Sequence, residues 1–217
     1  ATYGSYYQEK QHLLGVYYTP LPLELQEQAQ LRRADLYPFN MRVRVLLQMG
    51  TADTSDDYIK SLRLLARSRW VHWLDVRVCL GGQVEFHDDL AQEMSNIDFL
   101  KKQIVNERQP MYGHYRWADM AIGSAGVSQL ERLLMQIPSI IIPNSADQEI
   151  SKLAAEQGWS SLLALCDDER LFDIDDFLCS LNERKNSPQP ECCLVDGRGA
   201  QRVLVEVKKY LSQMTES

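Results

Sequence analysis

The sequence predicts an α/β fold in which a parallel sheet carries helices on both of its faces. Short apolar runs of strand type alternate along the chain with helical segments of about 10–14 residues. The strand-like runs end at glycine or at polar turn residues, and no tight two-residue hairpin signal joins one to the next. Strands without hairpins are connected by crossovers through helices, and such crossovers make neighbouring strands parallel.

The expected strands are continuous apolar runs, which is typical of strands buried on both faces. The run VRVLLQM is stopped by Gly50, and the run LDVRVCL is stopped by Gly81 and Gly82. Further runs follow the same pattern toward the C-terminus. The expected strands are 43–49, 74–80, a short piece within 96–105, 119–122, 139–142 and 160–166.

The expected helices are recognised by apolar residues that recur every three or four positions. In the segment 56–68, this spacing places Ile59, Leu62, Leu65 and Ala66 on one face. The expected helices are 23–34, 56–68, 87–94, a short one within 109–118, 128–136, 147–157, 175–184 and the long amphipathic segment 199–214.

Composition and charge exclude several classes of protein. The chain has 217 residues, of which 45% are hydrophobic and 24% charged, as in ordinary globular proteins. The net charge of −7 and the lack of any Lys/Arg cluster longer than two residues argue against nucleic acid as a partner. No apolar run approaches the ~20 residues of a membrane-spanning helix. We therefore expect a cytoplasmic protein without a membrane span.

The cysteine and histidine patterns give no sign of a metal or disulfide framework. The five cysteines are an odd number and contain no CxxC pair, so reduced cytoplasmic thiols are the favoured interpretation. The four histidines show no HxH or HExxH spacing. We expect neither a metal ion nor a cofactor.

Ligands of parallel α/β sheets bind beyond the carboxyl ends of the strands, so the loops that follow the strands are the candidate site. These loops are 50–55, 81–83, 123–127 and 143–147. The stretch GSAGVSQLE is the most informative of them, because small residues allow close backbone approach and a helix N-terminus attracts anions. By itself it favours an ordinary capped turn between a strand and a helix.

Glu131, within this stretch, has two readings. Ser128 is a candidate helix cap, with Glu131 three residues later as in a capping box. Alternatively, the Glu131 carboxylate accepts hydrogen bonds from the vicinal hydroxyls of a ribose. In two neighbouring loops, Asp53 is a plausible helix cap and Gln148 can meet a ligand, whereas His114 and Tyr115 are expected to be structural.

Taken in order, the motifs resemble a known family. They run from LLGVYYTPLPLEL (13–25) through RVLLQMGTAD, ADMAIGSAGVSQLERLLMQIPSIII, ADQ and LAAEQGW to VDGRGAQRVL (195–204). The series is similar to the C-terminal half of the UDP-2,4-diacetamido-2,4,6-trideoxy-altropyranose hydrolases. These enzymes belong to pseudaminic acid biosynthesis and have spore-coat polysaccharide relatives. That family is itself similar to the GT-B glycosyltransferase that makes lipid II.

The resemblance implies a Rossmann-like domain, one half of a GT-B fold, with a UDP-linked nucleotide-sugar in its cleft. Gly123, Ser124, Gly126 and Ser128 would then face the diphosphate and Glu131 the ribose. Gly50, Asp53 and Gln148 would line the same cleft. Residues 1–40 would be a connector arm and helix from a missing N-terminal half, and residues 41–217 the nucleotide-sugar-binding domain.

The resemblance also leaves alternatives open. Thr51, Ala125, Val127 and Asp147 depart from the family pattern at positions expected to face the ligand. In that family the catalytic histidine belongs to the N-terminal Rossmann-like half, which would be supplied in cis or by a separate chain. Besides a bacterial UDP-sugar hydrolase, the sequence is compatible with half of a GT-B glycosyltransferase or with a degenerate binding or regulatory domain.

Overall fold

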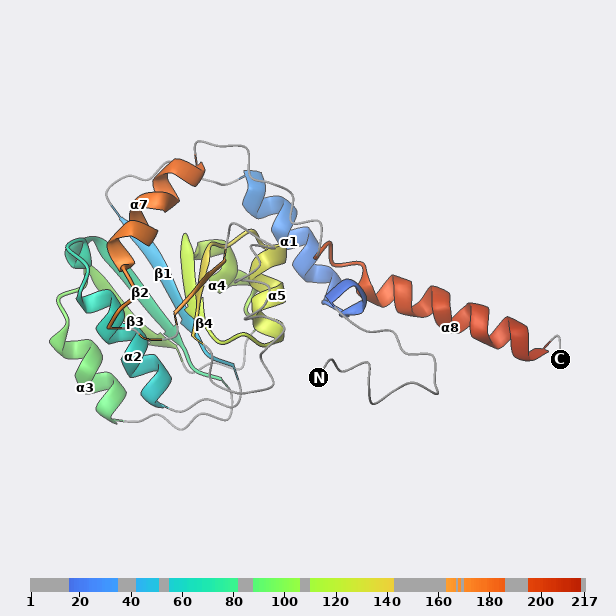
Figure 1. Ribbon diagram of the computed structural model, residues 1–217, viewed down its shortest axis with the longest axis horizontal. Coiled ribbons are helices and arrows are strands. Elements are labelled where there is room, and N and C mark those ends of the chain that lie inside the picture. Colours follow the sequence, from blue (N-terminus) through green and yellow to red (C-terminus); the bar gives the residue numbers. More distant parts are fainter. Residues whose placement is uncertain are drawn as a thin grey trace.

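The computed structural model describes residues 16–34, 42–50, 55–81, 88–105, 110–142, 163–166, 168, 170–185 and 195–215. These residues form an α/β domain around a six-stranded sheet in the order β3-β2-β1-β4-β5-β6 (Figure 1). Every neighbouring pair of strands is parallel. The strands are β1 (Val43–Gln48), β2 (Leu74–Cys79), β3 (Lys101–Val105), β4 (Met120–Gly123), β5 (Ser139–Ile141) and β6 (Leu163–Leu165).

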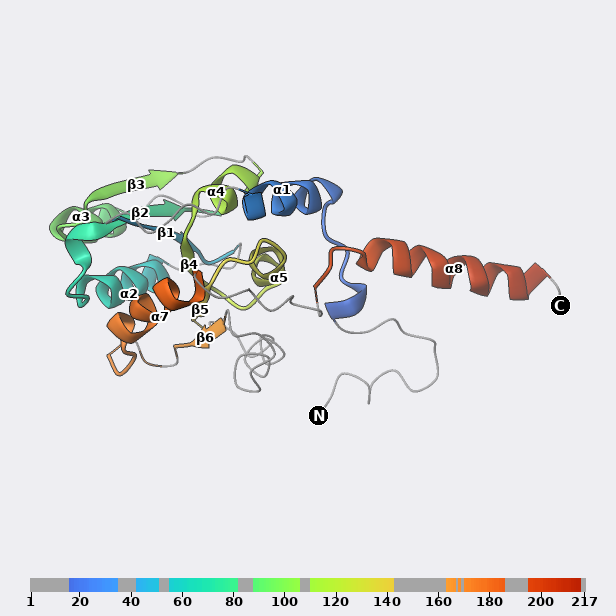
Figure 2. The ribbon, with the colours of Figure 1, turned by 90° about the horizontal axis from the view of Figure 1, so that it is seen from above.

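Helices lie on both faces of this sheet, as the sequence predicts. Figure 2 shows α2 and α7 on one side of the strands and α1 and α4 on the other. The helices are α1 (Leu23–Ala34), α2 (Ser55–Ala66), α3 (Asp88–Asn96), α4 (Tyr112–Trp117), α5 (Val127–Leu134), α7 (Ile174–Lys185) and α8 (Gly199–Thr215), with two 3-10 turns, η2 (Val16–Tyr18) and η3 (Val71–Trp73). The expected helix 147–157 lies outside the described residues.

The first face of the sheet packs against α2, α3 and α7. Leu62 and Leu65 of α2 are fully buried there, together with Tyr58. Ile59 is half-buried and packs against the same cluster, whereas Ala66 is exposed, so the expected apolar face of this helix is confirmed except at Ala66. The helix also turns Tyr58 inward, because its hydroxyl donates to the Cys79 carbonyl at 2.8 Å and can also accept from a backbone amide.

The second face packs against α1, α4 and α5. Leu25 and Ala29 of α1 are buried in one apolar cluster with Ala121 of β4 and Leu133 of α5. Helix α1 therefore belongs to the packed body of this domain, although it falls in the stretch 1–40 expected to be a connector. The assignment of that stretch to a missing half stays a prediction.

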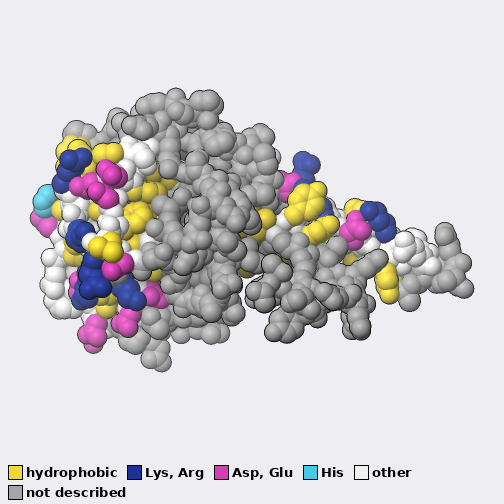
Figure 3. Space-filling model, viewed as in Figure 1, with side chains coloured by type: hydrophobic (Ala, Val, Ile, Leu, Met, Phe, Trp, Pro, Cys, Tyr) yellow, Lys and Arg dark blue, Asp and Glu magenta, His cyan; other side chains and the backbone are white. Residues whose placement is uncertain are grey.

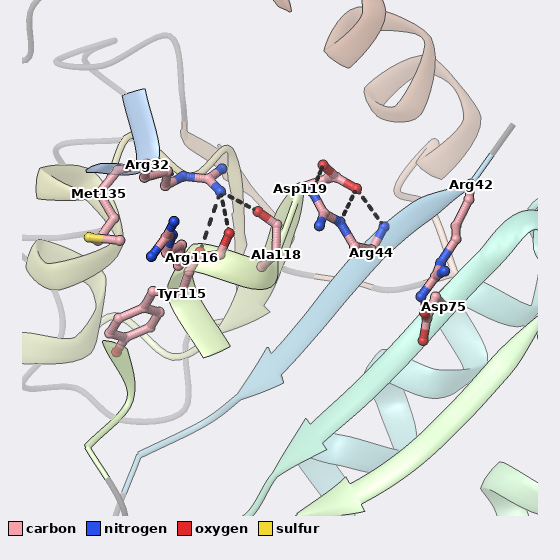
Figure 4. Close-up of polar contacts among 9 residues, drawn as sticks. All are labelled: Arg32, Arg42, Arg44, Asp75, Tyr115, Arg116, Ala118, Asp119 and Met135. Atoms are coloured by element: carbon pink, nitrogen blue, oxygen red, sulfur yellow. Dashed lines mark hydrogen bonds and ion pairs between the residues drawn. The ribbon is translucent and has the colours of Figure 1, made fainter. Parts of the chain in front are cut away.

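Arg32 fixes α1 to the ends of two other helices (Figure 4). Its guanidinium donates to the carbonyls of Ala118 at 2.7 Å and Met135 at 2.9 Å, and at longer range to those of Tyr115 and Arg116. These carbonyls lie at the C-terminal ends of α4 and α5, where a cation is favoured. Burial lowers the pKa of Arg32 to about 10, and the nearby Asp119 carboxylate partly opposes that shift.

The segment 196–202 packs against η2 and the residue that follows it. Arg202 pairs with Asp196, donates to the Tyr17 carbonyl at 3.0 Å and stacks over the Tyr17 ring. A Cβ at Gly199 would lie 2.1 Å from the Thr19 carbonyl oxygen, so only glycine fits there. The first and last motifs of the sequence are thus joined in space and have a structural role.

Beyond this contact, α8 projects away from the sheet (Figures 1 and 2). Hydrophobic side chains are exposed along it (Figure 3), including Leu204, Val207 and Leu211. Among the described residues, no helix has both the length and the apolar character needed to cross a membrane.

Candidate functional site

The candidate site lies where the strand order of the sheet reverses. From β1 the chain moves outward to β2 and β3, and from β4 it moves the other way to β5 and β6, so β1 and β4 flank the switch point. Gln48, the last residue of β1, is paired with Gly123, the last residue of β4. Loops that leave a switch point diverge and open a crevice at the carboxyl edge, which is the usual ligand position in this architecture.

The two loops that leave these strands touch each other. The Ser124 hydroxyl donates to the Met49 carbonyl, which ties the loop after β4 to the loop after β1. Gly50 has a φ of 100°, a left-handed conformation that residues with a side chain rarely adopt. A Cβ at Gly50 would lie 3.5 Å from the Ser124 hydroxyl oxygen. Gly50 thus allows the chain to turn tightly beside Ser124.

Gly123 allows the closest backbone approach at this edge. A Cβ there would lie 2.1 Å from the Gln48 carbonyl oxygen and 2.7 Å from the Arg132 Nη1 atom. A Cβ at Gly126 would meet nothing within 4 Å. The first glycine of the loop is therefore required by packing. The second leaves open space over the backbone, as a ligand that contacts the loop would need.

A buried guanidinium supports the loop from below. Arg132 of α5 is fully buried, and its Nη2 donates to the Ser124 carbonyl at 2.7 Å while its Nη1 reaches the Gln48 side-chain oxygen at 3.4 Å. Burial lowers its pKa, and the nearby Tyr115 and Glu131 favour the charged form. Its Nε, like the Gln129 side-chain oxygen, has no hydrogen-bond partner in the described part of the chain.

The start of α5 differs from the capping box expected from the sequence. Gly126 is the N-cap residue, in an extended conformation, and the helix begins at Val127, so Ser128 is not the cap. No side chain among the described residues caps this end. Because the helix begins before Ser128, Glu131 lies beyond the third helical position that a capping box uses. The Gln129 amide donates to the Gly126 carbonyl at 3.0 Å, and the amides of Val127 and Ser128 before it have no acceptor within the helix.

Glu131 instead accepts a hydrogen bond from Tyr115, whose hydroxyl lies 2.6 Å from Oε2. The same hydroxyl is 2.9 Å from the side-chain oxygen of Gln48. A phenol has one proton to donate, and the shorter distance to a carboxylate assigns that proton to Glu131. Burial raises the pKa of Tyr115 and the Glu131 charge raises it further, so the hydroxyl stays protonated.

The structure brings most of the expected site residues together at one edge. Gly50, Gly123 and Ser124 lie at the switch point, and Gly126, Ser128 and Glu131 lie on or next to the first turns of α5. Asp53 and Gln148 lie outside the described residues, as do the departures Thr51 and Asp147.

The two described departures have different surroundings. Ala125 is buried in the second apolar cluster, whereas Val127 is 58% exposed at the start of α5. Packing therefore accounts for the methyl group at position 125. At position 127 the exposed side chain is an apolar valine, whereas the hydrolase family that the sequence resembles has a serine hydroxyl there.

Three residues of the site were not predicted as site residues from the sequence: Gln48, Tyr115 and Arg132. Tyr115 was assigned a structural role, yet it contacts Glu131 directly. A signal existed for Gln48, which is a polar residue that ends β1 directly after three buried apolar residues and is 8% exposed. Arg132 interrupts the buried face of α5, and a cation at such a position implies acceptors inside the domain.

Comparison with known proteins gives a fold and not a family. No protein-family model and no curated protein matches this sequence. Among solved structures, the chain is similar to MurG of Acinetobacter baumannii, with a TM-score of 0.55 and 12% identity over 78% of this chain and 48% of that one. It is also similar to a protein assigned as a UDP-N-acetylglucosamine 2-epimerase from Listeria monocytogenes. The TM-score there is 0.51, with 11% identity over 90% of this chain and 50% of that one.

The chain therefore spans about half the length of the solved structures it resembles. At these identities the likeness establishes the fold alone. It is a Rossmann-like α/β domain of the kind that forms one half of a GT-B protein, as the sequence predicts.

Proposed function

We propose that this chain is the nucleotide-binding half of a GT-B enzyme and that its ligand is a UDP-linked sugar. The observation that carries the proposal is the meeting of two predicted loops at the switch point of the sheet, where Ser124 binds the Met49 carbonyl beside Gly50. The position is the one at which α/β sheets of this type hold ligands. One of the similar structures is also assigned as an enzyme that acts on a UDP-sugar, UDP-N-acetylglucosamine.

The diphosphate is proposed to lie over the loop 124–126 and the first turn of α5. This turn has amide groups without a side-chain cap, and Gly126 leaves space above the backbone. A helix N-terminus favours an anion without any exposed cation. That property suits a protein of net charge −7, and the buried Arg132 beneath the loop adds positive potential at the same place.

The ribose is proposed to lie next to Glu131. Its side chain is partly exposed, and its Oε2 is the atom that binds the Tyr115 hydroxyl. A carboxylate has about four acceptor positions, so it can accept from a ribose as well as from Tyr115. From the first turns of one helix, Glu131 is within reach of a sugar whose phosphates bind at the N-terminus of that helix.

The proposed reaction is that of a UDP-sugar hydrolase in bacterial pseudaminic acid or surface polysaccharide biosynthesis, the family whose motifs the sequence resembles. In the complete enzyme, water attacks the anomeric carbon, the bond from that carbon to the β-phosphate oxygen breaks, and UDP leaves. The base that takes the proton of water would come from the other Rossmann-like half. A glycosyltransferase would differ only in using an acceptor hydroxyl in place of water.

Calorimetric titration of the full chain with UDP, CDP and GDP tests the proposal. We expect UDP to bind in the millimolar range or tighter and the Glu131→Ala variant to bind it more weakly. Glu206→Ala removes a carboxylate from α8, outside the proposed site, and should leave the affinity unchanged. If no nucleotide binds at millimolar concentration, even when the other half is supplied, the proposal fails and a degenerate domain is the better reading.

A further inference from the structure

The contact between Tyr115 and Glu131 leads to a further inference, which rests on the proposed function. We propose that Tyr115 is a positioning residue that holds the Glu131 carboxylate toward a vicinal diol, so that the site selects ribonucleotides over 2′-deoxyribonucleotides. Tyr115 itself does not touch the ligand in this proposal. It acts through Glu131.

The first argument is the geometry of the contact. The distance of 2.6 Å from the Tyr115 hydroxyl to Glu131 Oε2 is that of a charge-assisted hydrogen bond. The hydroxyl sits between the Glu131 and Gln48 oxygens and can donate to only one of them. The Gln48 oxygen can accept a hydrogen bond from Arg132 Nη1, so it does not depend on Tyr115 for a donor. The Tyr115 hydroxyl therefore donates to Glu131.

The second argument is the rigidity of Tyr115. The side chain is fully buried within the second apolar cluster, between α1, α4 and α5. Its backbone is held from both sides, since its amide donates to the Met111 carbonyl at 2.9 Å and its carbonyl accepts from Arg32. A hydroxyl on such a side chain cannot follow a moving carboxylate, so the carboxylate is held where the hydroxyl is.

The third argument concerns what Glu131 would do without this bond. Its neighbour along the helix is the cation Arg132. A glutamate side chain without a fixed partner rotates about several bonds, and it loses this conformational freedom when it binds a ligand. The hydrogen bond from Tyr115 removes much of that loss before the ligand arrives. A carboxylate fixed in one orientation offers a fixed pair of acceptor directions, which is what recognition of two adjacent hydroxyl groups requires.

The test compares the affinities of UDP and 2′-deoxy-UDP. In the wild-type chain we expect UDP to bind about tenfold more tightly, the equivalent of one good hydrogen bond to a charged group. In Tyr115→Phe the ratio should fall toward about twofold, because the carboxylate is no longer oriented. A merely structural role for Tyr115 would weaken both nucleotides equally and leave the ratio unchanged.

Tyr58→Phe is the matched control. Tyr58 is also fully buried and hydrogen-bonded through its hydroxyl, but its partners are the Cys79 carbonyl and the Met49 amide and not Glu131. Its ratio should equal that of the wild type. Should Tyr115→Phe fail to fold, Glu131→Gln provides a second test at a partly exposed position, and its ratio should also fall.

The outcomes separate this inference from the proposed function. If wild-type protein binds UDP and 2′-deoxy-UDP equally, or if Tyr115→Phe or Glu131→Gln keeps the wild-type ratio, the inference is overturned while nucleotide binding stands. If wild-type protein binds neither nucleotide, the proposed function itself fails.

Discussion

Gly123→Ala probes the packing on which the candidate site depends. The added Cβ would lie 2.1 Å from the Gln48 carbonyl oxygen, whereas ordinary contacts begin at 3.4 Å. The backbones of β1 and β4 would have to separate by roughly 1 Å or more, because backbone atoms cannot rotate away as a side chain does. The same atom would approach Arg132 Nη1 at 2.7 Å and disturb its bond to the Ser124 carbonyl.

Overpacking of this kind and the weakened buried hydrogen bonds together give an expected loss of about 3 kcal/mol in the free energy of unfolding. Urea denaturation followed by circular dichroism measures it. Gly126→Ala is the matched control, because its Cβ meets nothing within 4 Å and should change stability by less than about 1 kcal/mol. The control should nevertheless weaken UDP binding if the phosphates approach the backbone there. Equal stability of the two variants would refute the reasoning.

Three further predictions concern the scaffold. Arg32→Met should lower the free energy of unfolding by about 3 kcal/mol, since it leaves four carbonyls at two helix ends without their donor; unchanged urea stability would contradict this. Asp196→Asn should destabilise the chain at neutral pH. Hydrogen bonding from Arg202 lowers the pKa of Asp196, so its contribution is present above the ordinary value of about 4 and is lost as the pH falls through the lowered pKa. The stability difference from the wild type should therefore vanish in acid, and a pH-independent difference would count against the ion pair. Gln136→Gly should stabilise the chain by about 1 kcal/mol, because Gln136 has a φ of 54° at the end of α5; a lower melting temperature would show that the strain argument is wrong.

The order and type of the described elements could be predicted because each depends on local pattern. The strand β1 is an apolar run stopped by Gly50, and α8 is a long segment with period-3.6 spacing. The position of the site followed from the fold class, since a parallel sheet has its ligand edge at the carboxyl ends of its strands. The sequence could not predict the surroundings of α8, along which hydrophobic side chains are exposed in the described part of the chain.

The chemistry inside the site could not be predicted in the same way. Tyr115 and Glu131 are far from each other along the chain, and only the packing of α4 against α5 brings their side chains together. The prediction of a capping box was wrong because of the local position at which the helix starts. The helix begins at Val127, directly after the extended Gly126, and this earlier start carries Glu131 out of the capping position. The sequence could indicate that Arg132 needs internal acceptors, but only the structure identifies them as the Ser124 carbonyl and the Gln48 oxygen.

The most direct test of the central claim is a crystal structure of the full chain soaked with UDP. Density for the diphosphate is expected over the loop 124–126 and the N-terminus of α5, with the ribose next to Glu131 and its carboxylate still bound to Tyr115. A nucleotide bound anywhere other than the β1–β4 switch point, or a crystal that takes up no UDP at concentrations well above the calorimetric Kd, would contradict it.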